Sequence, residues 1–429
     1  MKTTIAGVCA WEALDSRGTP TVACEVLLDG GARGGATVPS GASTGTHEAR
    51  ELRDGGERYG GRGVRRAVEN VRDVLGPAVV GRDAEDQAGL DAALRAVDGT
   101  PTLGRVGANA VLAVSVAATL AAAQASGVSL YRWLSGDADP LLPLPMVNII
   151  SGGAHASGAV DMQDFLVVPV GARSFAQAIE WAWRVRRGAV TVAAERGLPV
   201  ALVADEGGLG PPLPSNRAAL ELLAAGIARA GLRLGAEVAI AVDVAATQLL
   251  RGGAYHLAAE GRVFDGAGLL DELVSWCADY PIVSLEDPAG EDDWAAWAAA
   301  SARLGRQLQL LADDLFVTDL PRLERGIAAG VANAVLVKPN QTGTLSDARA
   351  VVARAQRAGY ATVMSARSGD TEDTWLADLA VGWRAGQIKV GSLTRSERTA
   401  KWNRLLRIEA EAGGRALFAG RAVLGLRRG

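Results

Sequence analysis

The chain has 429 residues, of which 49% are hydrophobic and 21% charged, and its formal net charge is -4. That much apolar side chain can bury a sizeable core, which excludes a wholly disordered protein. The near-neutral charge gives no reason to expect nucleic acid or an anionic membrane as a partner. Three scattered cysteines exclude a disulfide framework, and no run of about 18 uncharged apolar residues predicts a transmembrane helix. Asp15 and Arg17 interrupt the N-terminal segment too early for a signal peptide, so we expect a cytoplasmic protein.

The N-terminal part of the chain has the pattern of a small α+β domain. Apolar and polar residues alternate over residues 1–40, with turn residues between them, which predicts an antiparallel meander. Helical periodicity follows over 64–134, and its Ala-rich last part suits a tightly packed buried helix. A Gly-, Asp- and Pro-rich join at 135–145 predicts a domain boundary. We therefore expect an N-terminal α+β capping domain over 1–138 and a second domain over 139–429.

Short apolar runs alternate with helical stretches in the second domain. The runs that predict strands are 164–171, 200–208, 238–245, 282–287, 308–315, 334–340, 361–368 and 387–392. Eight β/α units that close on themselves form a barrel of ~250 residues, which fits this length. An open doubly wound sheet is the competing fold, but no GxGxxG motif follows an early strand. The predicted fold is therefore an α/β barrel with an N-terminal α+β domain.

Lysine is scarce in this chain, because only four of its 44 basic residues are lysine. These are Lys2, Lys338, Lys389 and Lys401. Lysine differs from arginine because its ammonium can lose a proton when its pKa is lowered. The four lysines are therefore the first candidates for proton chemistry.

Charged side chains stand at the carboxyl ends of the predicted strands. Asp243, Glu286 and Asp313 end three consecutive runs, and Lys338 ends the next one. In a barrel these ends meet at one mouth, where barrel active sites lie. Each carboxylate alone could cap the following helix. Three in succession followed by a lysine favour a site for a hard cation such as Mg²⁺.

Longer motifs add a family resemblance. The segments are DSRGTPTV, SGASTGTHEA, VADEGGLGP, SLEDP, LADDLFVTD, KPNQTGTLSDA, GDTEDTWLADLAVG and QIKVGSLTRSERTAKWNRLLRIE. They resemble enolase (phosphopyruvate hydratase), and the similarity runs from about residue 5 to 412. The resemblance implies an enolase-type modified TIM barrel, whose second strand runs antiparallel to the others. It also implies that the N-terminal domain supplies a mobile loop that closes over the site.

The resemblance implies a metal site and a base. Asp243, Glu286 and Asp313 would bind one Mg²⁺ tightly, and Ser43 would bind a second Mg²⁺ that arrives with the substrate. Lys338 would remove the proton alpha to the substrate carboxylate. Such a proton is scarcely acidic, so the enediolate must be held by concentrated positive charge. We expect the nearby cations to lower the pKa of Lys338, as a base near neutrality requires.

The remaining roles also follow from the resemblance. Glu206 would be the acid that assists departure of hydroxide, and His155 would be the histidine of a second active-site loop. Lys389 would grip the substrate carboxylate. Arg367 and Ser368 would bind the phosphate.

Two positions depart from the enolase pattern. Ala366 stands where enolases have a histidine in Ser-His-Arg-Ser, and Asp164, after Gln163, stands where they have a glutamate. Residues 245–248 also lack the usual Ser-Glu pair. Both main changes fall where the leaving hydroxyl of 2-phosphoglycerate should sit, and a methyl group in place of imidazole opens space beside the phosphoryl pocket. We therefore take Asp164 as a candidate catalytic residue, and Gln163 and Ala366 as candidate substrate-binding residues.

Three functions remain open. The favoured one is a divergent enolase-superfamily enzyme that acts on a small phosphorylated or phosphonate carboxylic acid, similar to the carboxyphosphonoenolpyruvate synthase of phosphonate and phosphinate antibiotic biosynthesis. The first alternative is ordinary glycolytic enolase, which converts 2-phosphoglycerate to phosphoenolpyruvate and water. The second is a non-catalytic enolase-like binding protein, against which the retained metal ligands and lysines argue. A homodimer or higher homo-oligomer is implied by the resemblance.

Overall fold

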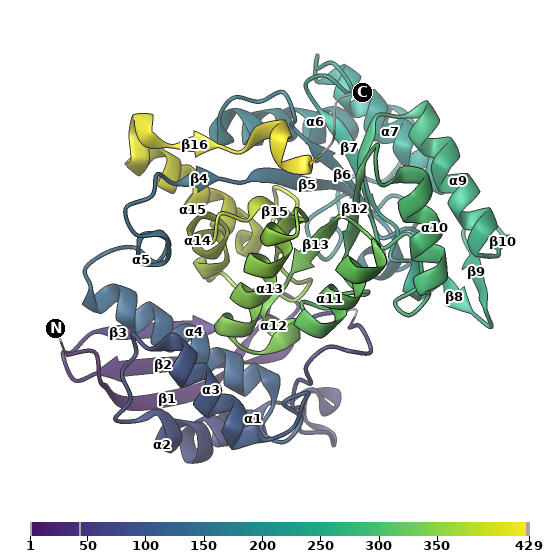
Figure 1. Cartoon of the computed structure of the whole chain (residues 1–429). Helices are drawn as coiled ribbons and strands as arrows, with labels where there is room; N and C mark the ends of the chain where they lie inside the picture. Colours follow the sequence, from purple (N-terminus) through teal and green to yellow (C-terminus); the bar gives the residue numbers. More distant parts are fainter. Residues whose placement is uncertain (1, 43, 426–429) are drawn as a thin grey trace.

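The computed structural model describes residues 2–42 and 44–425, so the predicted metal ligand Ser43 lies outside the described residues. A three-stranded sheet covered by helices forms the N-terminal part (Figure 1). Eight strands close into a barrel in the C-terminal part, surrounded by helices. The predicted fold class, an α/β barrel with an N-terminal α+β domain, is confirmed.

The N-terminal sheet is the antiparallel meander that the sequence predicts. Its strands are β1 (Ile5–Leu14), β2 (Pro20–Leu28) and β3 (Arg33–Thr37), in that order across the sheet. Helix α4 (Ala108–Ala125) packs on β2 and β3. Gly34 allows this close approach, because a Cβ there would lie 2.1 Å from the carbonyl oxygen of Ala117.

Helix α4 is the Ala-rich segment that the sequence predicts to be buried. By length and composition alone it could cross a membrane, but 89% of its apolar window is buried inside the protein. It is therefore a core helix. The other helical segments of this part are η1 (Arg58–Gly61), α1 (Arg65–Asn70), η2 (Val71–Leu75), α2 (Gly76–Val79), α3 (Gln87–Asp98) and α5 (Leu130–Ser135).

The barrel strands follow one another around the circle in chain order. They are β5 (Leu144–Ser151), β6 (Asp164–Val168), β7 (Ala239–Asp243), β11 (Ile282–Glu286), β12 (Gln309–Ala312), β13 (Ala334–Val337), β14 (Ala361–Ser365) and β15 (Gly386–Gly391). The second strand, β6, pairs antiparallel with β5 and β7, as the resemblance implies. The start of β6 therefore lies at the same end of the barrel as the carboxyl ends of the other strands.

The prediction of one strand was wrong. Residues 200–208 form turns and short bridges, and Leu202 in this run is 83% exposed. Gly207 has a φ of +82°, which interrupts an extended strand. The first barrel strand is instead β5, which lies partly within the segment that we took for a linker. Prolines at 140, 143 and 145 gave that segment the composition of a join, although Pro145 is itself part of the strand.

Helices form the outer layer of the barrel. They are α6 (Phe175–Glu195), α7 (Asn216–Arg229), α8 (Ala246–Leu249), α9 (Gly266–Asp279), α10 (Trp294–Leu304), α11 (Leu320–Ala329), α12 (Pro339–Thr342), α13 (Leu345–Arg357), α14 (Trp375–Gly382) and α15 (Ser396–Ala412). Asp265, Asp293 and Asp319 accept the backbone N–H bonds that cap α9, α10 and α11. The carboxylates at the strand ends are therefore not needed to cap these three helices.

Smaller strands complete the fold. They are β4 (Leu141–Leu142) paired with β16 (Leu417–Phe418), and the sheet of β8 (Leu250–Arg251), β9 (Ala254–Leu257) and β10 (Arg262–Phe264). The barrel interior is a separate apolar cluster that includes Leu166, Leu311 and Val363. Charged side chains are concentrated above it, at the mouth.

Candidate active site

The strand register brings the predicted carboxylates and lysines to one end of the barrel. Glu286 at the end of β11 lies opposite Asp243 at the end of β7. Asp313 and Lys338 directly follow β12 and β13, and Lys389 lies on β15. These five side chains come from separate strands, so the closed sheet itself fixes their relative positions.

Lys389 joins two of the predicted metal ligands. Its Nζ lies 2.7 Å from Oδ2 of Asp243, and 2.8 and 2.7 Å from the two carboxylate oxygens of Glu286. All three side chains are buried. Burial disfavours the ammonium, but the Asp243 and Glu286 carboxylates outweigh it and raise the pKa of Lys389 well above its usual value. Lys389 is therefore a fixed positive charge at the mouth.

Lys338 pairs with the third predicted ligand. Its Nζ lies 2.5 Å from Oδ2 of Asp313, whose Oδ1 accepts a hydrogen bond of 2.9 Å from Nε2 of Gln341. Burial disfavours the Lys338 ammonium, yet Asp313 outweighs it and raises the pKa of Lys338. We expected a lowered pKa for this base. The protein's own charges do not produce that lowering, whereas cations bound at Asp313 would act toward it.

The mouth holds more buried negative charge than the two lysines balance. Burial and the Asp243 carboxylate raise the pKa of Glu286 well above its usual value. Burial and Asp313 raise the pKa of Asp314 to about 7. Buried carboxylates that lie this close together offer the oxygen donors that a hard divalent cation prefers, so the residues present fit Mg²⁺.

Among residues 2–42 and 44–425, two groups of side chains could hold an ion in the geometry observed. The ligand atoms of Asp287, Asp313 and Asp314 lie within 4.8 Å of one another, as do those of His155, Asp164 and Glu206. Of the three predicted metal ligands, only Asp313 belongs to the first group. Asp243 and Glu286 instead both contact the Lys389 ammonium. Asp287 is already occupied, because its oxygens accept the backbone N–H groups of Asp313 and Asp314 at 3.0 and 2.9 Å. Asp287 therefore orients its neighbours.

His155 connects two carboxylates on the β5–β6 side of the mouth. Its Nδ1 lies 3.0 Å from Oδ2 of Asp164, and its Nε2 lies 3.7 Å from Oε1 of Glu206. The other oxygen of Asp164 accepts hydrogen bonds from Asn148 at 2.5 Å and Ser151 at 3.1 Å. Three of the four predicted catalytic residues, His155, Asp164 and Glu206, thus lie together, and the protein holds both oxygens of Asp164.

The pKa of His155 carries a testable consequence for stability. Burial alone would lower it, but Asp164 and Glu206 raise it to about 9. Protonated His155 therefore stabilises the folded chain fully below about pH 6.5, and this contribution is lost as the pH rises to about 9. We expect the difference in unfolding free energy between wild type and His155→Gln to shrink between pH 6 and pH 10. Urea unfolding at both pH values measures it, and a constant difference would contradict the assigned charge.

Gln163 contacts one of the predicted metal ligands. Its Nε2 donates a hydrogen bond of 3.0 Å to Oδ2 of Asp243, and its Oε1 accepts one of 2.8 Å from Gln248. Gln248 is one of the positions that departs from the family pattern, and here it orients Gln163.

Arg367 is held by an acid from the N-terminal part. Its guanidinium lies 2.9 Å from Oε2 and 3.3 Å from Oε1 of Glu48, and 3.1 Å from Oδ1 of Asn340. Burial disfavours its charge, but Glu48 outweighs it and raises the pKa of Arg367. Next to it, Oγ of Ser368 accepts a hydrogen bond of 2.6 Å from the backbone N–H of Ala42. The two predicted phosphate ligands therefore lie against the segment that flanks residue 43.

Sequence reasoning missed the residue that supports this loop. Arg398 on α15 is fully buried and donates to the carbonyl oxygens of Arg367 at 2.7 Å, Ser368 at 2.5 Å and Val390 at 3.0 Å. Its guanidinium also lies 3.9 Å from Glu206. The sequence offered no signal for this role, because an arginine within a polar helix looks the same whether it is buried or on the surface.

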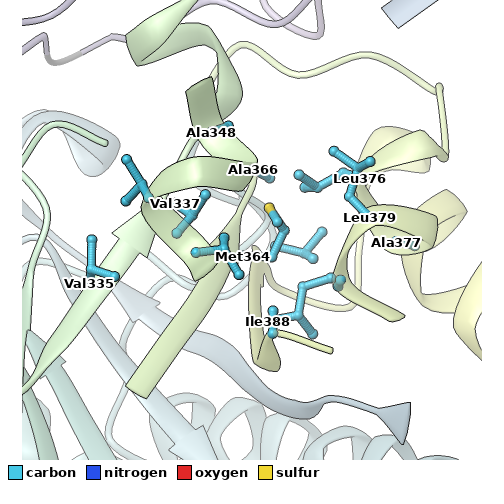
Figure 2. Close-up of a cluster of buried hydrophobic side chains, with 14 of the residues drawn as sticks. Val335, Val337, Ala348, Met364, Ala366, Leu376, Ala377, Leu379 and Ile388 are labelled. Carbon is cyan, nitrogen blue, oxygen red and sulfur yellow. The ribbon is translucent and has the colours of Figure 1, made fainter. Parts of the chain in front are cut away.

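Ala366 does not join the polar groups of the mouth. Figure 2 shows it with Val337, Met364 and Leu376 in an apolar cluster between the strands and the helices. It lines a cavity of about 10 Å³, which is room for about one water molecule. The space that we expected from the missing imidazole is therefore small.

Comparison with protein-family models agrees with this arrangement. Residues 139–426 match the model of the enolase C-terminal TIM barrel domain, and residues 5–134 match that of the enolase N-terminal domain. Such a pair of domains defines an Mg²⁺-dependent enzyme of the lyase type. The chain belongs to the enolase family, whose members bind a small acid substrate and generally form oligomers.

Proposed function

We propose that this enzyme removes the proton alpha to the carboxylate of a 2-phosphoglycerate-like acid and forms an enolpyruvyl phosphate or phosphonate. The supporting observation is the meeting of Lys338 and Lys389 with Asp313, Asp243 and Glu286 at one barrel mouth. Asp243, Glu286 and Asp313 would hold Mg²⁺, with a second ion at Ser43. Bound Mg²⁺ would supply the positive charge that makes the alpha proton acidic.

The side chains of this chain would then divide the proton transfers between them. Neutral Lys338 accepts the alpha proton at Nζ, and Lys389 holds the substrate carboxylate. The bond from the beta carbon to its oxygen breaks with its electron pair on the oxygen, which takes a proton from Glu206. His155 lies 3.7 Å from Glu206 and positions that side chain. Arg367 and Ser368 hold the phosphoryl oxygens.

The leaving-group side favours a divergent member of the family. Asp164 is one methylene shorter than the family's glutamate, and Asn148, Ser151 and His155 occupy its oxygens. It therefore reaches less far toward a leaving hydroxyl than a glutamate would. We infer a phosphonate or phosphorylated acid other than 2-phosphoglycerate as the substrate, as for carboxyphosphonoenolpyruvate synthase. Ordinary glycolytic enolase is the second candidate, because the proposed grip on metal and carboxylate is complete.

A coupled assay for phosphoenolpyruvate separates these two candidates. We expect the wild type to dehydrate 2-phosphoglycerate far below ordinary enzyme rates of ~10 s⁻¹ at saturating Mg²⁺. Asp164→Glu with Ala366→His should raise that rate at least about tenfold, because proton transfer needs heavy atoms within ~2.6–3.2 Å.

The cavity at Ala366 is too small for an imidazole unless neighbouring groups move. The single variant Asp164→Glu therefore serves as the control, because it restores the longer carboxylate without adding the imidazole. A circular dichroism melt of each variant reports whether it folds. A wild type that turns over 2-phosphoglycerate at ~10 s⁻¹ or more would contradict the proposal of a divergent substrate. Glycolytic enolase would then be the remaining candidate function.

We also propose a cytoplasmic homodimer or higher homo-oligomer. Large apolar side chains are exposed on β1, where Trp11 is 49% and Leu14 56% exposed, and on α6, where Trp183 is 55% exposed. Contiguous apolar patches mark interaction sites, and we propose that protomers bury these side chains between them. Sedimentation velocity at micromolar concentration should give at least twice the chain mass, and Trp11→Glu should shift it toward the monomer. A wild type that sediments as a monomer would contradict the proposal.

A further inference from the structure

Lys401 is a buried lysine that the proposed function does not use. It lies on α15, three residues after Arg398, and both side chains are at most 1% exposed. Residues at this spacing are neighbours on one face of a helix. Both cations contact the loop of residues 366–371, which carries the proposed phosphate ligands Arg367 and Ser368.

Each of the two cations holds a different part of this loop. Arg398 donates to two of its backbone carbonyl oxygens. Lys401 pairs with a carboxylate instead, because its Nζ lies 2.6 Å from Oδ1 of Asp370, and it also donates to the carbonyl oxygen of Thr371. Asp370 is 4% exposed, and in the described part of the chain Lys401 is the only cation that pairs with it.

Asp370 connects this ion pair to the backbone of the loop. Its Oδ2 accepts a hydrogen bond of 3.2 Å from the backbone N–H of Arg367, and its Oδ1 accepts one of 2.7 Å from that of Thr371. Its own carbonyl oxygen accepts from the N–H of Ser16 at 2.8 Å, which joins the loop to the N-terminal part. The carboxylate is therefore the link between the Lys401 ammonium and the backbone of Arg367.

Removal of the ammonium would leave this carboxylate buried and unpaired. Such a charge is strongly destabilising where it stands, so the Asp370 side chain would move toward water or toward another donor. The backbone N–H groups of Arg367 and Thr371 would then lose their acceptor, and the loop would lose one of its two supports from α15.

We propose that Lys401 is a positioning residue for phosphate recognition. Through Asp370 it holds the backbone of Arg367, and its ammonium acts as a counter-charge rather than as an acid or a base. This inference rests on the proposed function, since it takes Arg367 and Ser368 as the phosphate ligands. Charge-assisted hydrogen bonds to phosphoryl oxygens depend on geometry, so a displaced loop would weaken the grip on phosphate and leave Mg²⁺ binding unaffected.

Hydrogen–deuterium exchange of the ligand-free chain, read by mass spectrometry on peptides that cover 366–371, tests the contact with the backbone. In Lys401→Met, which removes the charge and keeps a long side chain, the N–H groups of Arg367 and Thr371 should exchange at least about tenfold faster. Addition of Asp370→Asn should remove much of this increase, because an amide oxygen still accepts from the backbone and needs no counter-charge. Exchange at the wild-type rate in Lys401→Met would overturn the proposal.

Isothermal titration calorimetry with phosphoenolpyruvate at saturating Mg²⁺ tests the effect on phosphate recognition. We expect Lys401→Met to bind phosphoenolpyruvate at least about tenfold more weakly than the wild type, with unchanged affinity for Mg²⁺. The double variant Lys401→Met with Asp370→Asn should recover at least about threefold of that loss. Wild-type affinity for phosphoenolpyruvate in a Lys401→Met chain whose loop exchanges faster would overturn the link to phosphate.

Two matched controls separate positioning from general stability. Asp373 lines the same small cavity as Lys401 and Asp370, so Lys401→Met with Asp373→Asn removes a neighbouring carboxylate and should recover nothing. Arg407→Met removes an exposed cation from the same helix and should behave as the wild type does. Equal recovery by Asp370→Asn and Asp373→Asn, or recovery by neither, would overturn the proposal.

The two measurements fail in different ways. A wild type that does not bind phosphoenolpyruvate would contradict the proposed function, whereas exchange in the ligand-free chain would still decide the role of Lys401. A Lys401→Met chain that unfolds while the double variant with Asp370→Asn folds would support the assigned coupling of charges. Unfolding of both variants would overturn it.

Discussion

Lys338→Ala is expected to lower turnover by ~10²–10⁴-fold or more, because it removes the only proposed base. The loss should appear in kcat, since Lys338 is assigned to the proton transfer and the substrate carboxylate is assigned to Lys389. Mg²⁺ affinity should stay nearly unchanged or rise slightly, because the ammonium that pairs with Asp313 is gone. Steady-state kinetics with a separate Mg²⁺ titration measure both quantities.

Lys2→Ala is the matched control for this substitution. Lys2 is an exposed lysine far from the mouth in sequence, so its removal should leave kcat unchanged. Turnover of Lys338→Ala within a factor of about ten of wild type would mean that another group is the base.

Asp243→Asn, Glu286→Gln and Asp313→Asn are each expected to weaken Mg²⁺ binding at least about tenfold, since each removes an anionic donor from a hard cation. Calorimetric Mg²⁺ titration of the folded variants measures this. The structure supplies a sharp comparison, because Asp313 also belongs to the group formed with Asp287 and Asp314.

Asp314→Asn decides between the two candidate ligand sets. If Asp243, Glu286 and Asp313 bind the tight ion, this variant should keep most of its Mg²⁺ affinity. A loss in Asp314→Asn together with unchanged affinity in Asp243→Asn and Glu286→Gln would assign the tight ion to the Asp287, Asp313 and Asp314 group instead.

Much of the barrel mouth could be predicted because its residues lie at the ends of short apolar runs. Asp243 and Glu286 end buried strands, Asp313 and Lys338 directly follow them, and in a closed barrel such positions share one end. The antiparallel direction of β6 came from the resemblance, and it puts Asp164 at this end although Asp164 begins its strand.

The contacts that cross between distant segments could not be predicted. Glu48 and Arg367 are 319 residues apart in the chain, and no local pattern marks them as partners. Strand β5 was missed because its prolines resemble a linker, while buried Pro145 pairs with β15 in the closed sheet. The surroundings of Ala366 depend on which face of the sheet its side chain takes, and strand alternation beyond Met364 puts it with the outer apolar cluster.

Exchange of the substrate alpha proton with solvent tests the central claim most directly. The wild type and Lys338→Ala are incubated with Mg²⁺ and 2-phosphoglycerate in D₂O, and proton NMR follows loss of the alpha-proton signal. Exchange reports proton abstraction even where departure of hydroxide is slow. We predict exchange with the wild type and none above background with Lys338→Ala. Exchange that persists in the variant, or its absence with the wild type, would contradict the account.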